Sequence, residues 1–184
     1  MQASIRIRRA AESDALSLSA LAENTFRTAF AEANTSENME LHCTSTYSPA
    51  LQLAEIRDPR CETWVADSDH KLAAYVQLRL DATLPTISGE RPIEIQRFYV
   101  EASHHGSGLA HQLMAHVLTR ARAVGAAAIW LGVWERNSRA LAFYRKWRFS
   151  VIGEHIFKVG DDPQRDLLMC RSGESDEVAA SGHL

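Results

Sequence analysis

The stretch PIEIQRFYVEASHHGSGLA, residues 92–110, decides the fold of this chain. A run of extended character leads into a loop of small and polar residues, and a helix follows in which apolar residues recur at helical spacing. Gly106 and Gly108 stand where the backbone must turn and face outward. Several peptide N–H groups then point one way at the positive end of a helix. The stretch therefore predicts a strand, an anion-binding loop suited to a phosphate or pyrophosphate, and a helix.

Two common phosphate-binding motifs do not fit this loop. The dinucleotide fingerprint needs a third small residue where this chain has His111, and no Lys-Ser/Thr follows as in a P-loop. A turn containing glycine also joins many strands to helices without binding anything. The loop alone therefore leaves a purely structural role open.

The loop and its flanks resemble motif A of the GNAT superfamily of N-acetyltransferases, a hydrophobic strand followed by Arg/Gln-x-x-Gly-x-Gly/Ala. Gly108 and Ala110 match this pattern, and His105 takes the place of the usual Arg or Gln. The histidine leaves backbone N–H donation intact but makes the charge of the loop sensitive to pH.

A second stretch, AAIWLGVWERNSRALAFYRKWRF at residues 127–149, is similar to motif B of the same superfamily. Arg148 replaces the glycine that usually ends its helix. The matching residues are Asn137, Ala140, Phe143, Tyr144, Lys146 and Phe149. Two patterns in the right order are far more specific than one, so the chain is identified as a member of this superfamily.

The resemblance implies a single-domain α/β fold, α+β by some schemes, over residues 1–172. Its mixed, mostly antiparallel twisted sheet has helices on both faces. The parallel pair, residues 93–100 and 127–134, is expected to splay apart at its C-terminal ends, and the helix from Leu109 would form a right-handed crossover between the two strands. Residues 173–184 are small, polar and acidic, and are predicted to form a disordered tail.

Periodicity and turn residues predict the remaining elements. Asp14 is expected to cap a helix whose apolar face includes Leu16 and Leu18. Gly160, Asp161, Asp162 and Pro163 are expected to form a turn between the last two strands. The other predicted segments are a strand at residues 4–8, helices at 37–46 and 49–56, and strands at 63–66, 72–78, 151–158 and 165–170.

By resemblance, acetyl-CoA is the co-substrate and a small-molecule amine the acceptor. The backbone near Phe98, Tyr99 and Val100 would orient the pantetheine arm, with Ala140, Phe143 and Tyr144 beside the cofactor. The pyrophosphate would lie on His105, Gly106, Ser107, Gly108, Leu109 and Ala110. Asn137 would bond the pantetheine or cap the helix that begins at Ser138, and both roles are compatible.

Two residues are candidates for catalysis. Tyr144 is expected to protonate the departing thiolate, although an ordinary packed aromatic would look the same in sequence. Glu94, expected on one strand face with Gln96, Phe98 and Val100, is a candidate general base acting directly or through water. A solvated carboxylate without a catalytic role remains the alternative for Glu94.

Composition narrows the possible partners. With 20 basic and 23 acidic residues the formal net charge is −3, which argues against non-specific nucleic-acid binding. No long apolar run predicts a membrane span. Three widely spaced cysteines suggest free thiols in a reducing cytoplasm. His111 and His116 lie five apart, off the metal-binding i, i+4 face, so no metal site is expected.

The segment from Ile152 to Met169 is similar to the one that closes PaiA-type polyamine acetyltransferases, and this implies a polyamine or similar cationic acceptor. Asp161, Asp162 and Asp166 are nevertheless expected to serve the turn and strand-end solvation rather than polycation binding. A protein N-terminal or lysine acetyltransferase and a non-catalytic acyl-CoA-binding module remain alternatives. A homodimer also remains open, because dimers are common in the superfamily.

Overall fold

The computed structural model describes residues 5–68, 71–87 and 89–173. Its elements follow the predicted order, so the single-domain α/β architecture is confirmed, while residues 174–184 of the predicted tail lie outside the described residues. The elements are β1 (Ile5–Arg9), α1 (Ala15–Phe30), α2 (Ser36–Thr46), α3 (Pro49–Arg57), β2 (Cys61–Ser68), β3 (Lys71–Arg79), β4 (Ile93–Val100), α4 (Leu109–Ala123), β5 (Ala128–Trp134), α5 (Ser138–Lys146), β6 (Ser150–Val159) and β7 (Asp162–Ser172).

The strands form one seven-stranded sheet in the order β1-β2-β3-β4-β5-β7-β6. Every neighbouring pair is antiparallel except β4 and β5. These two pair only at their N-terminal ends, where Ile93 lies opposite Ile129 and Glu94 opposite Trp130. Beyond that point they separate, which confirms the predicted splay.

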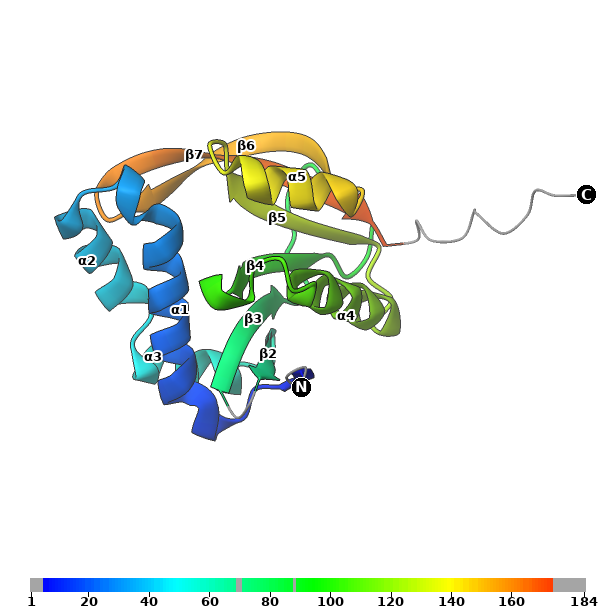
Figure 1. Cartoon of the computed structure of the whole chain (residues 1–184). Coiled ribbons are helices and arrows are strands. Elements are labelled where there is room, and N and C mark those ends of the chain that lie inside the picture. Colours follow the sequence, from blue (N-terminus) through cyan, green and yellow to red (C-terminus); the bar gives the residue numbers. More distant parts are fainter. Residues whose placement is uncertain (1–4, 69–70, 88, 174–184) are drawn as a thin grey trace, which may run out of the picture.

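Helices cover both faces of the sheet, with α1, α2 and α3 on one face and α4 and α5 on the other (Figure 1). On the α4–α5 face, Leu113 and Val117 pack with Val76 in a core of fully buried side chains. On the α1–α3 face, Phe26 and Tyr75 belong to a second buried cluster. The sheet therefore separates two cores, and the gap between β4 and β5 lies between them.

Three helices begin at a residue whose side chain caps the N-terminus of the helix. The side-chain oxygens of Thr35, Ser48 and Asn137 each accept a backbone N–H at the start of α2, α3 and α5. The predicted cap by Asp14 is wrong, because its carboxylate accepts hydrogen bonds from Arg8 and the Ala11 N–H instead.

Two further details differ from prediction. Leu16 is 71% exposed and lies off the buried face of α1. The turn after β6 is shorter than expected, because Asp162 and Pro163 already pair with Val159 and Lys158 in the sheet. Only Gly160 and Asp161 connect the two strands, as a tight hairpin whose glycine has a φ of 60°.

The β6–β7 hairpin reaches back to the α1–α2 region, where Figure 1 shows its far end beside α2. The Asp161 N–H donates to Asn38 Oδ1 at 3.1 Å, and Gln164 Nε2 donates to Asn34 Oδ1 at 2.6 Å. A Cβ at Gly160 would meet Asn38 atoms at 2.7–2.9 Å, so this close approach needs glycine. These contacts fasten the hairpin across the α1–α3 face.

Candidate active site

The loop before α4 has the backbone geometry of an anion cradle. Gly106 and Gly108 have φ of 78° and 86°, the left-handed region that glycine adopts without strain. Within the described part of the chain, the N–H groups of Gly106, Gly108 and Ala110 have no acceptor. The Ser107 N–H donates to the His104 carbonyl, and the Leu109 N–H donates to Ser107 Oγ. Three donors are therefore open at the positive end of α4.

His105 and Arg139 add polar groups beside this cradle. The Arg139 guanidinium lies 3.0 Å from His105 Nδ1, and His105 Nε2 lies 2.9 Å from the Val100 carbonyl. A second nitrogen of Arg139 lies 2.9 Å from His105 Nε2, so the guanidinium contacts both ring nitrogens. Arg139, on the first turn of α5, is a residue that sequence reasoning missed. Its permanent positive charge suits an anionic ligand.

The strand β4 contains an irregularity that changes which side chains share a face. Gln77 pairs with Arg97 and Leu78 with Ile95, so Gln96 has no opposite residue. The two-residue alternation is therefore reset at Gln96.

Because of this irregularity, the side chains that were predicted to share one face of β4 do not all point to the same core. Phe98 and Val100 pack with Ile93 and Ile95 in the α4–α5 core. The expectation that Glu94 shares their face is wrong, because Glu94 alternates with Ile93 and Ile95 and so points to the α1–α3 face. Tyr99 also lies on that face, in the α1–α3 core.

Tyr144 lies on α5, in the α4–α5 core, beside Phe98 of β4. The ring centroids of Tyr144 and Phe98 are 6.3 Å apart, and those of Tyr144 and Phe143 are 5.5 Å apart. Burial, with a smaller contribution from the charge of Tyr99, raises the pKa of Tyr144. A phenol with a raised pKa stays protonated at neutral pH, and a general acid must be protonated to donate.

The helix of motif B is built as its sequence suggests. Asn137 Oδ1 accepts the Ala140 N–H at 3.0 Å, so the capping role is present. Arg148, at the usual glycine position, has a φ of 64° and ends α5 in the left-handed conformation. Ala140 and Phe143 pack at the edge of the α4–α5 core.

Glu94 is partly buried, and this burial raises the pKa of its carboxyl group, while Arg79 opposes the rise. The Arg79 side chain also contacts Asp58 at 3.1 Å and Gln96 at 2.9 Å, so its charge is shared. Glu94 and Tyr144 lie on opposite faces of the sheet, and the two candidates can act together only across the gap beside β4.

Asp166 is the second site residue that sequence reasoning missed. It was expected at a solvated strand end, but it lies within β7 and is only 8% exposed. Its neighbours in the register are Trp134 of β5 and His155 of β6, and His155 Nε2 lies 3.8 Å from Asp166 Oδ2. Burial raises the pKa of Asp166 to about 6. The Asp166 carboxyl group therefore titrates well above the usual range of an aspartate.

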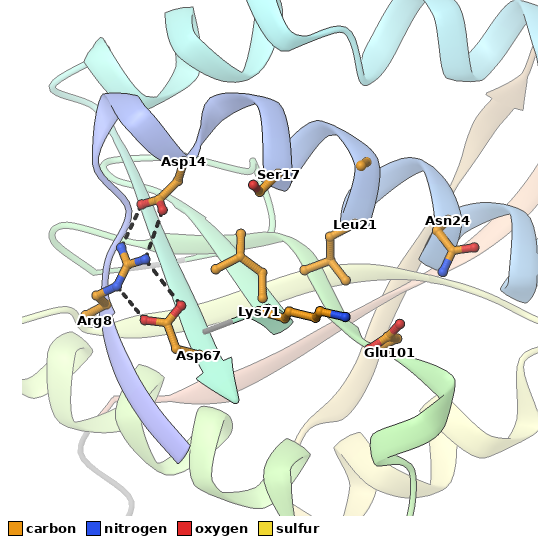
Figure 2. Close-up of a pocket in the computed structure, with 10 residues that line it drawn as sticks. Arg8, Asp14, Ser17, Leu21, Asn24, Asp67, Lys71 and Glu101 are labelled. Atoms are coloured by element: carbon orange, nitrogen blue, oxygen red, sulfur yellow. Dashed lines mark hydrogen bonds and ion pairs between the residues drawn. The ribbon is translucent and has the colours of Figure 1, made fainter. Parts of the chain in front are cut away.

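A cavity of about 510 Å³ lies between α1 and the β2–β3 hairpin (Figure 2). Arg8 is held there between two carboxylates, 2.6 Å from both Asp14 and Asp67. Leu21, Lys71 and Glu101 also line the cavity, but none of the predicted site residues does. We assign no part of the chemistry to it.

Two findings on the described residues concern metal ligands and membrane spans. Among them, no three His, Cys, Asp or Glu side chains are grouped so that they could hold a metal ion. None of the helices in the described ranges is both long enough and apolar enough to cross a membrane.

The match to a protein family gives the class of this chain. A model of the acetyltransferase (GNAT) family matches residues 22–149, so the chain belongs to that family and is an N-acetyltransferase. An uncharacterized N-acetyltransferase of Mycobacterium tuberculosis is 33% identical over 159 residues, which cover 86% of this chain and 97% of the relative.

Two solved structures share the fold. The PaiA N-acetyltransferase from Thermoplasma acidophilum in complex with coenzyme A has a TM-score of 0.76 at 21% identity, over 92% of this chain and 99% of its own. A protein from Salmonella typhimurium, solved with its cofactor acetyl-CoA, has a TM-score of 0.68 at 17% identity, over 98% of this chain and 99% of its own. At these identities the likeness concerns the fold alone.

Proposed function

We propose that the protein transfers the acetyl group of acetyl-CoA to a primary amine, and that the preferred acceptor is a small cationic amine such as a polyamine. The observation that carries the proposal is the cradle of open N–H groups beside the gap between β4 and β5. A strand edge without a partner needs hydrogen bonds, and the amide-rich pantetheine arm can supply them. The cradle fits a pyrophosphate in charge and in backbone geometry.

The cofactor part of the proposal has further support. Solved relatives of the same fold bind coenzyme A or acetyl-CoA. Arg139 places a cation beside the cradle, and the backbone of Phe98 and Val100 runs along the gap. In this assignment Asn137, Ala140 and Phe143 contact the cofactor from α5, as the motif B resemblance implies.

We assign one proton transfer to Tyr144 on the α4–α5 face of the sheet and another to Glu94 on the α1–α3 face. Tyr144 is assigned the donation of a proton to the leaving thiolate sulfur. Glu94 is assigned the acceptance of the amine proton, directly or through water, and its partial burial on the α1–α3 face supports that role. Burial makes a carboxylate a stronger base, which suits proton abstraction near neutral pH.

The polyamine assignment is supported by the likeness of the fold to the PaiA N-acetyltransferase and by the slightly acidic charge of the chain. A protein N-terminus or lysine is the rival acceptor, and a non-catalytic acyl-CoA-binding module is the rival from another class.

Free-thiol release with a panel of acceptors separates these functions. Wild-type protein is incubated with acetyl-CoA and spermidine, spermine, an aminoglycoside or an N-terminal peptide, and the thiol released above the amine-free rate is measured. We expect the polyamines to give the highest kcat/KM. Turnover with peptides alone would refute the polyamine assignment, and acetyl-CoA binding without turnover on any amine would refute the enzymatic one.

A further inference from the structure

The α1–α3 face of the sheet brings four side-chain positions from three strands together beyond the point where β4 and β5 part. Gly132 and Trp134 lie two residues apart on β5 and so share a face. In the sheet register Trp134 lies opposite Asp166 of β7, and Asp166 lies opposite His155 of β6. Cross-strand neighbours of this kind place their side chains about 5 Å apart.

Gly132 keeps the side chains of His155 and Asp166 accessible. A Cβ at Gly132 would lie 3.2 Å from His155 Cε1, 3.3 Å from His155 Nε2 and 3.4 Å from Asp166 Oδ2. Gly132 is exposed, although it lies in the middle of β5. The missing side chain therefore leaves the His155–Asp166 pair open at the surface of the sheet.

The pair carries a negative charge that is not cancelled by a nearby cation. The N–O separation of 3.8 Å is longer than a hydrogen bond, and burial both raises the pKa of Asp166 and lowers that of His155. A tight ion pair would shift both values the other way. Above its pKa of about 6 Asp166 is an ionised carboxylate, and it lies beside an imidazole whose pKa is lower than the usual 6.5.

Two aromatic residues lie near Asp166, Trp134 opposite it on β5 and Tyr99 on β4. Tyr99 of β4 is close enough for the charge of Asp166 to contribute, after burial, to raising the Tyr99 pKa. Trp134 packs against Phe30 of α1, with ring centroids 5.7 Å apart. A buried carboxylate with aromatic residues nearby is a suitable environment for an organic cation.

We propose that Asp166, with His155, binds the protonated acceptor amine and removes its proton, so that the acceptor enters from the α1–α3 face. This inference rests on the proposed function, because it names the acceptor side of the same reaction. It adds a second candidate base, outside β4, to the one that the proposed function places at Glu94, and the Asp166 and Glu94 variants decide which carboxylate accepts the amine proton.

The step balances as follows. The ammonium group gives one proton to Asp166, from which it passes to solvent. The neutral amine nitrogen then forms a bond to the thioester carbonyl carbon, and the carbon–sulfur bond breaks. The second amine proton leaves the nitrogen as the amide forms, and it replaces the proton that Tyr144 gives to the thiolate sulfur. The products are the N-acetyl amine, the free thiol and one proton.

The test compares Asp166→Asn with Asp162→Asn, a matched change in the same strand. Asp162 accepts a hydrogen bond from Gln164 and lies at the hairpin end of β7. Spermidine binding to the complex of each protein with coenzyme A is measured calorimetrically at pH 7.5, and kcat/KM for spermidine is measured from pH 5.5 to 9. Thermal unfolding at pH 8 checks that the variants fold.

We expect Asp166→Asn to weaken spermidine binding about tenfold or more, and to abolish the rise in kcat/KM that ionisation of this carboxyl produces near pH 6. Asp162→Asn should match the wild type. Gly132→Ala, which crowds the pair without changing its charge, should also weaken binding. Equal spermidine affinity and equal pH profiles in Asp166→Asn and Asp162→Asn would overturn the inference, as would a wild-type complex that binds no amine.

The two proposals fail separately. If the wild type acetylates no amine but binds spermidine in a manner that depends on Asp166, the proposed function is wrong and the amine site stands. If Asp166→Asn and the wild type acetylate spermidine with the same constants, the function stands and this site is wrong.

Discussion

Replacing Gly108 by alanine should separate the anion-binding role of the cradle from its structural role. Gly108 has a φ of 86°, and a Cβ built on it meets no atom within 4 Å. The change therefore causes no clash, and its effect on stability is backbone strain alone, about 1–2 kcal/mol for a left-handed alanine. For a chain of 184 residues that corresponds to a loss of roughly 2–8 °C in Tm.

Gly125 provides a matched control at the other end of α4. It has a φ of 68°, and a Cβ there also meets nothing within 4 Å. Gly125→Ala should therefore lower Tm about as much as Gly108→Ala. Only Gly108→Ala adds a methyl group to the surface that carries the open N–H groups, where a bound pyrophosphate must approach the backbone closely.

The measurement is the Kd of coenzyme A by calorimetry, together with Tm, for both variants and the wild type. We expect Gly108→Ala to bind at least about tenfold more weakly, a loss of about 1.4 kcal/mol, while Gly125→Ala binds like the wild type. Equal affinities in the two variants, with equal losses in Tm, would show that the cradle does not hold the cofactor.

Three further substitutions test the assigned roles. Tyr144→Phe should lower kcat roughly tenfold to a thousandfold and leave the Kd of coenzyme A unchanged; an unchanged kcat would make Tyr144 a packing residue. Glu94→Gln should lower kcat/KM without lowering Tm at pH 8, because burial raises the pKa of Glu94 and its ionised form destabilises the fold as pH rises through that value; unchanged kinetics would remove it from the mechanism. Glu62→Gln should destabilise the fold by about 1–3 kcal/mol at pH 7 by leaving Arg120 and Arg9 without their carboxylate. Burial alone would raise the pKa of Glu62, but the two arginines lower it overall, so this contribution is complete above its ordinary pKa of 4.5 and is lost as pH falls, which acid titrations of Tm would show.

Local signals predicted the elements well because each depends on a few neighbouring residues. The cap at Asn137 and the open loop at Gly106 and Gly108 followed from short patterns, while the left-handed conformation of Arg148 after α5 was not predicted. The predicted cap by Asp14 was wrong because Arg8 binds the Asp14 carboxylate, which therefore accepts no N–H at the start of α1.

The candidate site was predicted less completely, because its errors come from pairing between distant strands. The strand-face assignment of Glu94 assumed uninterrupted alternation, and the unpaired Gln96 appears only in the register with β3. The burial of Asp166 depends on β5 and β6 lying on its two sides. Arg139 and His105 meet across 34 residues, and no short motif records such a contact.

The cysteines favour direct transfer between the two substrates over a covalent acetyl-enzyme. The thiolate is the nucleophilic form of cysteine, so a cysteine that accepts an acetyl group needs a lowered pKa. Burial instead raises the pKa of the thiol in Cys43, Cys61 and Cys170. Cys43 lies in the α1–α3 core, and Cys61 is fully buried. Because none of the three thiols is activated, we expect the amine to attack the thioester itself, with both substrates bound at the gap between β4 and β5.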